Sequence, residues 1–86
     1  MSTPINERVE VLARFDPTAN LGKIFPVAMT WKNRRVEFKD LIFTSAHRIG
    51  EKRFVSLICK SDSADFELEF DSESYCWWLR KVVARE

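Results

Sequence analysis

Residues that could take part in catalysis or bind a metal are few in this 86-residue chain, and their spacing suits neither task. His47 is the only histidine, and no acidic residue stands at the spacing of a catalytic triad from it. Cys59 and Cys76 form no Cys-x-x-Cys pair, and with one histidine they do not complete the usual four ligands of a zinc site. The sequence therefore predicts no enzyme, no metal site and no bound cofactor.

Four carboxylates between positions 65 and 71 are the remaining candidates for chemistry. Carboxylates in different environments can act as acid and base, but these alternate with apolar residues, as on the solvated side of a half-buried strand. No calcium-binding loop surrounds them, and the two glycines of the chain supply no phosphate-binding loop. We interpret the row as a solvent-facing strand surface: Asp65, Glu67, Glu69 and Asp71.

The acidic segment also predicts the first half of a β-hairpin. A polar turn at 71–74 separates it from a β-forming run at 75–83. A turn centred on Ser72-Glu73 places Cys76 and Trp78 outside, with Trp78 opposite Glu67. The inner face then holds three core pairs: Phe70 with Tyr75, Leu68 with Trp77, and Phe66 with Leu79.

A helix over 75–83 is the alternative for the second half of this hairpin. Its apolar residues also fit the stripe of an amphipathic helix: Tyr75, Trp78, Leu79, Val82 and Val83. The run Tyr-Cys-Trp-Trp and the pair Val-Val favour a strand, because these are β-forming residues.

Alternation elsewhere predicts further strands at 8–15, 25–31, 34–39 and 53–60. Phe25, Val27, Met29 and Trp31 are placed on one face of the second of these strands. Residues 1–7 are predicted to form a flexible arm and 16–22 a loop, whereas 40–50 is compatible with a strand or a short helix.

Lys32-Asn33 is predicted to be the turn of a second hairpin. With that turn, Trp31 lies opposite Arg34, Met29 opposite Val36, and Val27 opposite Phe38, so the apolar residues share a face. A slip of one residue would bring charged residues among them, which favours this register.

The predicted fold class is mainly β: one domain over 1–86, built as a small antiparallel curled sheet or half-open barrel of five or six strands, with one short helix as an option. No apolar run is long enough for a membrane span. The first six residues lack the pattern of a signal peptide, and two cysteines are no disulfide framework. We therefore expect a cytoplasmic protein without a membrane partner.

Two segments resemble a known family. Residues 26–38 contain Trp31-Lys32-Asn33-Arg34, which is similar to a Trp-Lys/Arg-Gly-Arg hairpin, with Asn33 in place of the turn glycine. Phe66-Glu67-Leu68 with Trp78-Leu79-Arg80 resembles a Tyr-x-Leu…Trp-x-Leu ending. Together they resemble a family of small uncharacterised bacterial domains, some encoded beside genes for translesion DNA polymerases. The resemblance implies a strand at 77–82 and carries no catalytic residue.

Charge is unevenly distributed although the net charge is only +1. Residues 32–53 are rich in lysine and arginine, and all six charges between 61 and 74 are acidic. Cations that bind phosphates beside an aromatic residue that stacks on a base are typical of nucleic-acid binding. One hypothesis is therefore a nucleic-acid-binding accessory module with four phosphate contacts: Lys32, Arg34, Arg35 and Lys52.

Apolar residues on the outer side of the predicted sheet support the principal hypothesis. Phe54, Ile58 and Trp78 point away from the predicted core. They need a cover from within the chain or from another chain, and an open apolar patch marks a partner surface. We therefore expect a non-enzymatic protein-interaction module that binds a protein partner or forms a homo-oligomer.

Overall fold

The computed structural model describes residues 2–16 and 24–84, which fold into seven β-strands without a helix. The strands are β1 (Ser2–Phe15), β2 (Ile24–Trp31), β3 (Arg34–Glu37), β4 (Asp40–Ile49), β5 (Lys52–Lys60), β6 (Ala64–Asp71) and β7 (Cys76–Ala84). The mainly β fold class is confirmed. The prediction of five or six strands was too low, because the ambiguous segment at 40–50 forms a full strand, and neither optional helix is present.

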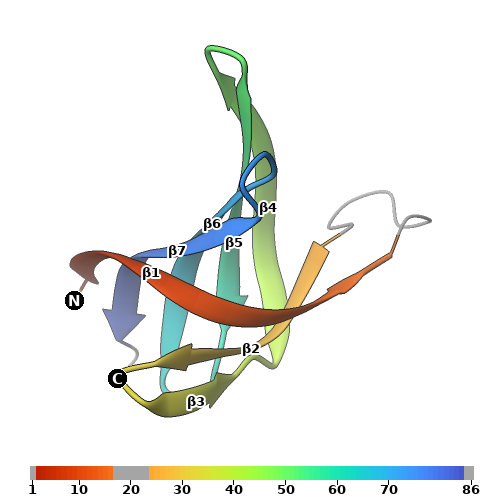
Figure 1. The fold of residues 1–86 in the computed structure, drawn as a ribbon. Coiled ribbons are helices and arrows are strands. Elements are labelled where there is room, and N and C mark those ends of the chain that lie inside the picture. Colours follow the sequence, from red (N-terminus) through yellow and green to blue (C-terminus); the bar gives the residue numbers. More distant parts are fainter. Residues whose placement is uncertain (1, 17–23, 85–86) are drawn as a thin grey trace.

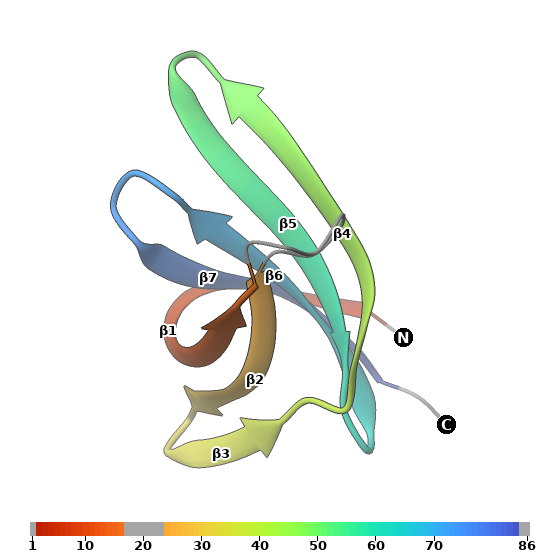
Figure 2. The same ribbon diagram turned by 90° about the vertical axis from the view of Figure 1, so that its right-hand side faces the viewer.

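All seven strands belong to one antiparallel sheet in the order β3-β2-β1-β7-β6-β5-β4. The first part of β1 pairs with β7, and its last part, from Glu10 to Phe15, pairs with β2. This long bent strand turns β2 and β3 back across the concave side of the other strands (Figures 1 and 2). The sheet is curled as expected but does not close into a barrel, since β3 and β4 remain its two edges.

The strand β1 begins earlier than the sequence indicated. Residues 2–4 pair with Lys81–Val83 of β7, so most of the predicted arm at 1–7 is strand, while Met1 lies outside the described residues. The register shifts between Pro4 and Glu7, where Asn6 has a φ of 57°. Lys81–Val83, near the end of β7, are the backbone partners of this segment.

The hairpin of β2 and β3 has the predicted register. Met29 lies opposite Val36 and Trp31 opposite Arg34, and the amide of Phe38 donates to the carbonyl of Val27 at 2.9 Å. Lys32 and Asn33 have φ values of 52° and 60°, the positive values that a type I′ turn requires at both central positions.

A bulge in β2 changes the face of its first residues. Leu12 lies opposite Ala28 but Ala13 lies opposite Pro26, so Val27 is an extra residue on its strand. Pro26 is therefore buried, while Phe25 lies on the other face beneath the guanidinium of Arg14 at 5.2 Å. The prediction that Phe25 shares a face with Met29 was wrong, because alternation does not reveal the bulge.

The strand interpretation of 75–83 is confirmed, but its register differs by two residues. Phe70 lies opposite Trp77 and Leu68 opposite Leu79. The turn is longer because the Oδ1 atom of Asp71 accepts hydrogen bonds from the amides of Glu73 and Ser74, at 3.0 and 3.4 Å. Tyr75 ends this turn with a φ of 59° and is 76% exposed, so its assignment to the core was wrong.

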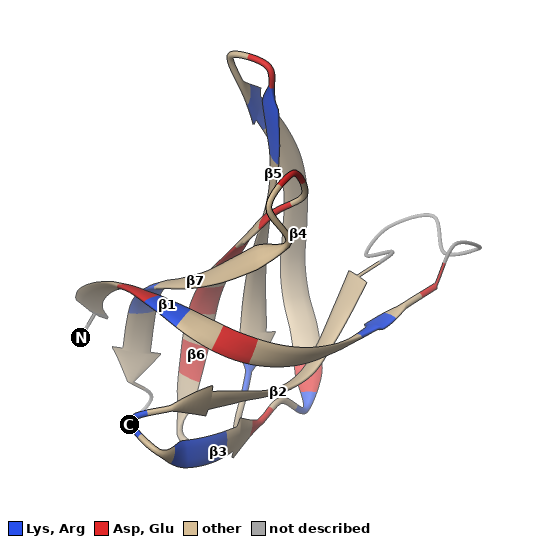
Figure 3. Ribbon diagram, viewed as in Figure 1, with Lys and Arg blue, Asp and Glu red and all other residues tan. Residues whose placement is uncertain are grey.

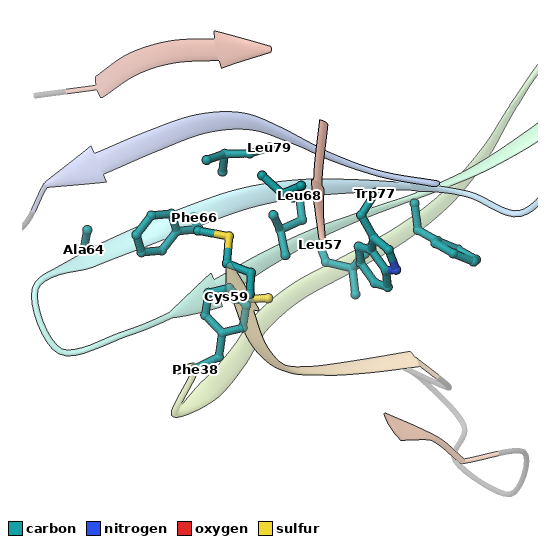
Figure 4. Packing of buried hydrophobic residues seen from close by; sticks show 11 residues of the cluster. Phe38, Leu57, Cys59, Ala64, Phe66, Leu68, Trp77 and Leu79 are labelled. Carbon is teal, nitrogen blue, oxygen red and sulfur yellow. The ribbon is translucent and has the colours of Figure 1, made fainter. Parts of the chain in front are cut away.

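The core fills the concave side of the sheet (Figure 4). Leu57, Leu68 and Leu79 are fully buried on three neighbouring strands, and Cys59 lies beside them. Burial raises the pKa of the Cys59 thiol to about 12, so this side chain is a neutral core residue. Neither Cys59 nor Cys76 forms a disulfide.

Candidate interaction surface

The two edges of the sheet differ in length and in protection. β3 has four residues, and three of them are charged: Arg34, Arg35 and Glu37. Short, charged edge strands are a common protection against pairing with other chains. β4 has ten residues, and within residues 2–16 and 24–84 it pairs only with β5. The edge of β4 is therefore the longer backbone surface open to a partner.

The hairpin geometry identifies the β4 residues whose backbone groups face this edge. The amide and hydroxyl of Ser72 donate to the carbonyl of Arg53, so the backbone of Arg53 points toward β6 and away from β4. Arg48 lies opposite Arg53, so these two residues form a non-hydrogen-bonded pair between β4 and β5. Because such pairs alternate, the N–H and C=O groups of Arg48, Ala46 and Thr44 point outward from the sheet.

Exposed apolar residues accompany this backbone edge. Phe43 is 50% exposed and Ile49 is 64% exposed, and both lie on the outer, convex face of β4. Ile42 is 52% exposed and occupies a bulge between Leu41 and Phe43. The regular part of the edge therefore runs from 43 to 49, with an exposed apolar residue at each end.

The three predicted partner residues lie on the same convex face but are each half-buried. Ile58 lies opposite Phe43, and Phe54 stacks on His47 with a ring-centroid distance of 5.8 Å and an interplanar angle of 22°. Both residues therefore adjoin β4. Trp78 lies on β7, opposite Glu69 rather than Glu67, and the guanidinium of Arg80 covers its ring at 5.0 Å.

A polar cluster separates Trp78 from the residues beside β4. Glu69 accepts a 2.8 Å hydrogen bond from Nη2 of Arg80 and lies 4.0 Å from Nε2 of His47. The hydrogen bond from Arg80 links β7 to Glu69 on β6, and His47 of β4 approaches the same carboxylate on this face. Among the described residues, no group of three histidine, cysteine or acidic side chains has a metal-binding arrangement.

The four predicted phosphate contacts fall at two separate places. Lys32, Arg34 and Arg35 lie on the β2–β3 hairpin, whereas Lys52 begins β5 at the far tip of the β4–β5 hairpin (Figure 3). Arg35 also pairs with Glu37 at 3.6 Å. The structure therefore places three of the four cations on one hairpin, with Arg34 and Arg35 on opposite faces of β3, and leaves Lys52 apart.

Trp31 is not placed to stack on a base. Its ring packs edge-on against Phe66 at 6.2 Å, and the ammonium of Lys32 lies over the ring at 4.8 Å. The Nε1 atom of Trp31 is buried and has no hydrogen-bond partner among the described residues. An open hollow of about 520 Å³ lies nearby and is lined by Arg8, Val9, Glu10, Thr30, Lys32 and Asn33.

Sequence reasoning missed the exposed apolar residues of β4. Leu41-Ile42-Phe43 was too continuous for simple alternation, and that irregularity was the available signal for the bulge. The exposure of Ile49 follows from its place beside Gly50 at the tip of an edge hairpin, which becomes evident only from the strand order.

Comparisons of this chain with protein-family models, with curated proteins and with solved structures give no significant match. The resemblance to small bacterial domains therefore remains a prediction. Within the described residues, no helix has the length and apolar character needed to cross a membrane. The surface next to β4 is the feature from which a function can be argued.

Proposed function

We propose that this protein is a non-enzymatic protein-interaction module that binds an extended protein segment along the open edge of β4. The observation that carries the proposal is the coincidence on one strand of outward backbone groups at Thr44, Ala46 and Arg48 with exposed apolar side chains at Phe43 and Ile49. A strand added at this edge forms hydrogen bonds with the outward backbone groups and covers the exposed apolar side chains.

The surroundings of β4 support this function. Ile58 adjoins Phe43, and the stacked pair of Phe54 and His47 lies between Phe43 and the hairpin tip. The edge therefore continues into a partly apolar surface that a bound segment's side chains can contact. Backbone pairing provides affinity in such complexes, and side-chain contacts provide selectivity.

A proline scan with a matched control tests the proposal. Ala46→Pro removes an outward N–H of β4 without removing a hydrogen bond to β5. Arg35→Pro is the control, because it makes the same change on the edge of β3. Arg35 lies opposite Thr30 in a non-hydrogen-bonded pair, so its N–H also points outward. Peptides are selected from a random displayed library on the unaltered protein, and their binding is measured by fluorescence anisotropy.

We expect Ala46→Pro to weaken binding of the selected peptides by at least about tenfold, which corresponds to roughly 1.4 kcal/mol. Arg35→Pro should leave their binding unchanged. A selection that yields no binding peptide, or peptides that bind both proline variants as well as the unaltered protein, would contradict the proposal.

Nucleic-acid binding is a second candidate, supported by the cations of the β2–β3 hairpin. Lys32 and Arg8 line the same open hollow, and Arg34 and Arg35 lie on the adjacent strand. Glu10 in that hollow and Glu37 beside Arg35 oppose binding of a phosphate backbone. A titration of labelled single-stranded and duplex DNA at low salt tests this candidate; it requires binding that weakens with added salt and with Arg34→Ala.

A further inference from the structure

The regular part of the β4 edge is complementary to itself. It spans residues 43–49, from the bulge at Ile42 to the turn at Gly50, and Ala46 is its midpoint. Phe43 and Ile49, the exposed apolar residues on its outer face, stand at equal distances on either side of that midpoint. An antiparallel copy of the same segment would therefore place each apolar residue opposite the other.

We propose that the segment bound along β4 is β4 of a second copy of this chain, so that two sheets join in an antiparallel pair centred on Ala46. This inference rests on the proposed function and names its partner. A two-fold axis perpendicular to the sheet keeps the outer faces of both copies on the same side. Phe43 then lies opposite Ile49 of the second copy, and Ser45 lies opposite its His47.

The hydrogen-bonding pattern agrees with this register. Ala46 faces Ala46 of the second copy, and Thr44 faces its Arg48, and these residues carry the outward N–H and C=O groups of the edge. Three such pairs make about six hydrogen bonds between the copies, because each hydrogen-bonded pair exchanges two. Phe43 and Ile49 fall in the intervening pairs, where the Cα atoms approach most closely and side chains meet best.

Other registers match the segment less well. If the axis passes through Ser45, Ile49 must pair with Leu41 across the bulge at Ile42, and fewer residues of the regular segment are paired. In the proposed register the charged Arg48 faces the neutral Thr44, so no like charges stand opposite each other. Centring on Ala46 is thus the register that uses the whole regular edge.

The arrangement of the described strands leaves room for this pairing. The β4–β5 hairpin extends past the ends of the neighbouring strands, so its outer edge is not flanked by the β1–β3 part of the sheet (Figure 2). Two strands of seven residues bury less than the roughly 1,200 Å² of a standard stable interface. We therefore expect a dimer that forms with rising concentration and dissociates on dilution.

Sedimentation equilibrium with two matched double variants tests both the dimer and its register. Phe43→Lys with Ile49→Lys places like charges opposite each other, whereas Phe43→Lys with Ile49→Glu places opposite charges there. The substituted side chains are at least half exposed, so both variants should keep the fold, which circular dichroism can verify.

The unaltered chain should approach twice its 10.1 kDa mass at high concentration. The lysine–lysine variant should stay at the mass of one chain, and the lysine–glutamate variant should dimerise again. A monomeric unaltered chain at every concentration, or equal behaviour of the two variants, would overturn the register-specific dimer. If the chain proves monomeric, the peptide assay separates the two proposals. Peptides that bind the unaltered protein but not Ala46→Pro would keep the interaction function, with a partner other than a second copy. A selection that yields no binding peptide would overturn both proposals.

Discussion

The guanidinium of Arg80 donates a 2.8 Å hydrogen bond to Glu69 across two neighbouring strands, and the same guanidinium covers the ring of Trp78. Arg80 is the extra residue at a bulge, because Glu67 lies opposite Lys81 while Leu68 lies opposite Leu79. Arg80 follows the inward Leu79 and so lies on the outer face, and the bulge brings Lys81 to the same face opposite Glu67. Arg80 thus covers Trp78 on the convex side of β6 and β7, although Trp78 had been predicted from the sequence to contact a partner.

Replacing Arg80 should destabilise the protein more than replacing a neighbouring lysine. Arg80→Ala removes the hydrogen bond to the partly buried Glu69 and the cover of Trp78, and we expect a loss of about 1–2 kcal/mol in the free energy of unfolding. Lys81→Ala is the control, since its 4.0 Å pair with Glu67 is more exposed and should contribute less than about 0.5 kcal/mol. Urea unfolding measures both; equal losses would contradict the role of Arg80.

The turn residue Asp71 should make stability depend on acidic pH. Hydrogen bonds from the amide of Glu73, and then from Ser74, lower the pKa of Asp71 below its ordinary value of 3.8. Because the folded-state pKa is the lower one, the stabilisation is present above 3.8 and is lost as pH falls through the folded-state pKa.

Asp71→Asn should therefore flatten the decrease in unfolding free energy below pH 3.8. Glu51→Gln, in the exposed turn between β4 and β5, is the control. Urea unfolding at a series of acidic pH values gives the comparison. If Asp71→Asn shows the same acid dependence as the unaltered protein, another carboxylate causes it.

Local sequence patterns predicted the strand pairing correctly where a short turn sets the register. Alternation around Lys32-Asn33 gave the pairs of β2 and β3 correctly, since one face is apolar and a slip would bury charges. The pattern failed at β6 and β7, because the turn length depends on hydrogen bonds from backbone amides to the side chain of Asp71. Trp77 and Leu79 were nevertheless predicted correctly to lie on the inner face, because a register shift of two residues leaves each side chain on the same face of the sheet.

The candidate surface was harder to predict because it depends on strand order. Phe54 and Ile58 were placed on the outer face from alternation alone, and the structure puts both beside β4. That β4 is an edge follows from the pairing of β1 with β7, a contact between the two ends of the chain. Bulges at Val27 and Arg80 also change local faces and have no clear sequence signature, whereas the continuous apolar run around Ile42 was the one available signal.

The two thiols should differ in reactivity toward a disulfide reagent. Burial raises the pKa of Cys59 to about 12 and removes its side chain from solvent, so little thiolate forms at neutral pH. Cys76 is only half-buried on β7. We expect one thiol to react in the folded protein and the second to react only on unfolding.

Single substitutions identify which thiol reacts. Cys76→Ser should abolish the reaction of the folded protein, and Cys59→Ala should leave it intact. Absorbance from the released reagent anion follows both reactions. Rapid labelling of folded Cys76→Ser would show that Cys59 is accessible, against the packing of the core.

Trp31 should tolerate replacement by phenylalanine better than Trp77 does. The indole Nε1 of Trp31 is buried without a hydrogen-bond partner among the described residues, an arrangement that costs about 1–3 kcal/mol. Trp31→Phe removes this polar group while keeping an aromatic ring against Phe66, so the lost packing is offset and stability should change by less than about 1 kcal/mol. Trp77→Phe loses volume beside Phe70 without such an offset and should cost more. Denaturant unfolding of both variants decides the comparison: a loss for Trp31→Phe as large as that for Trp77→Phe would show that Nε1 is satisfied in solution, by water or by another part of the chain.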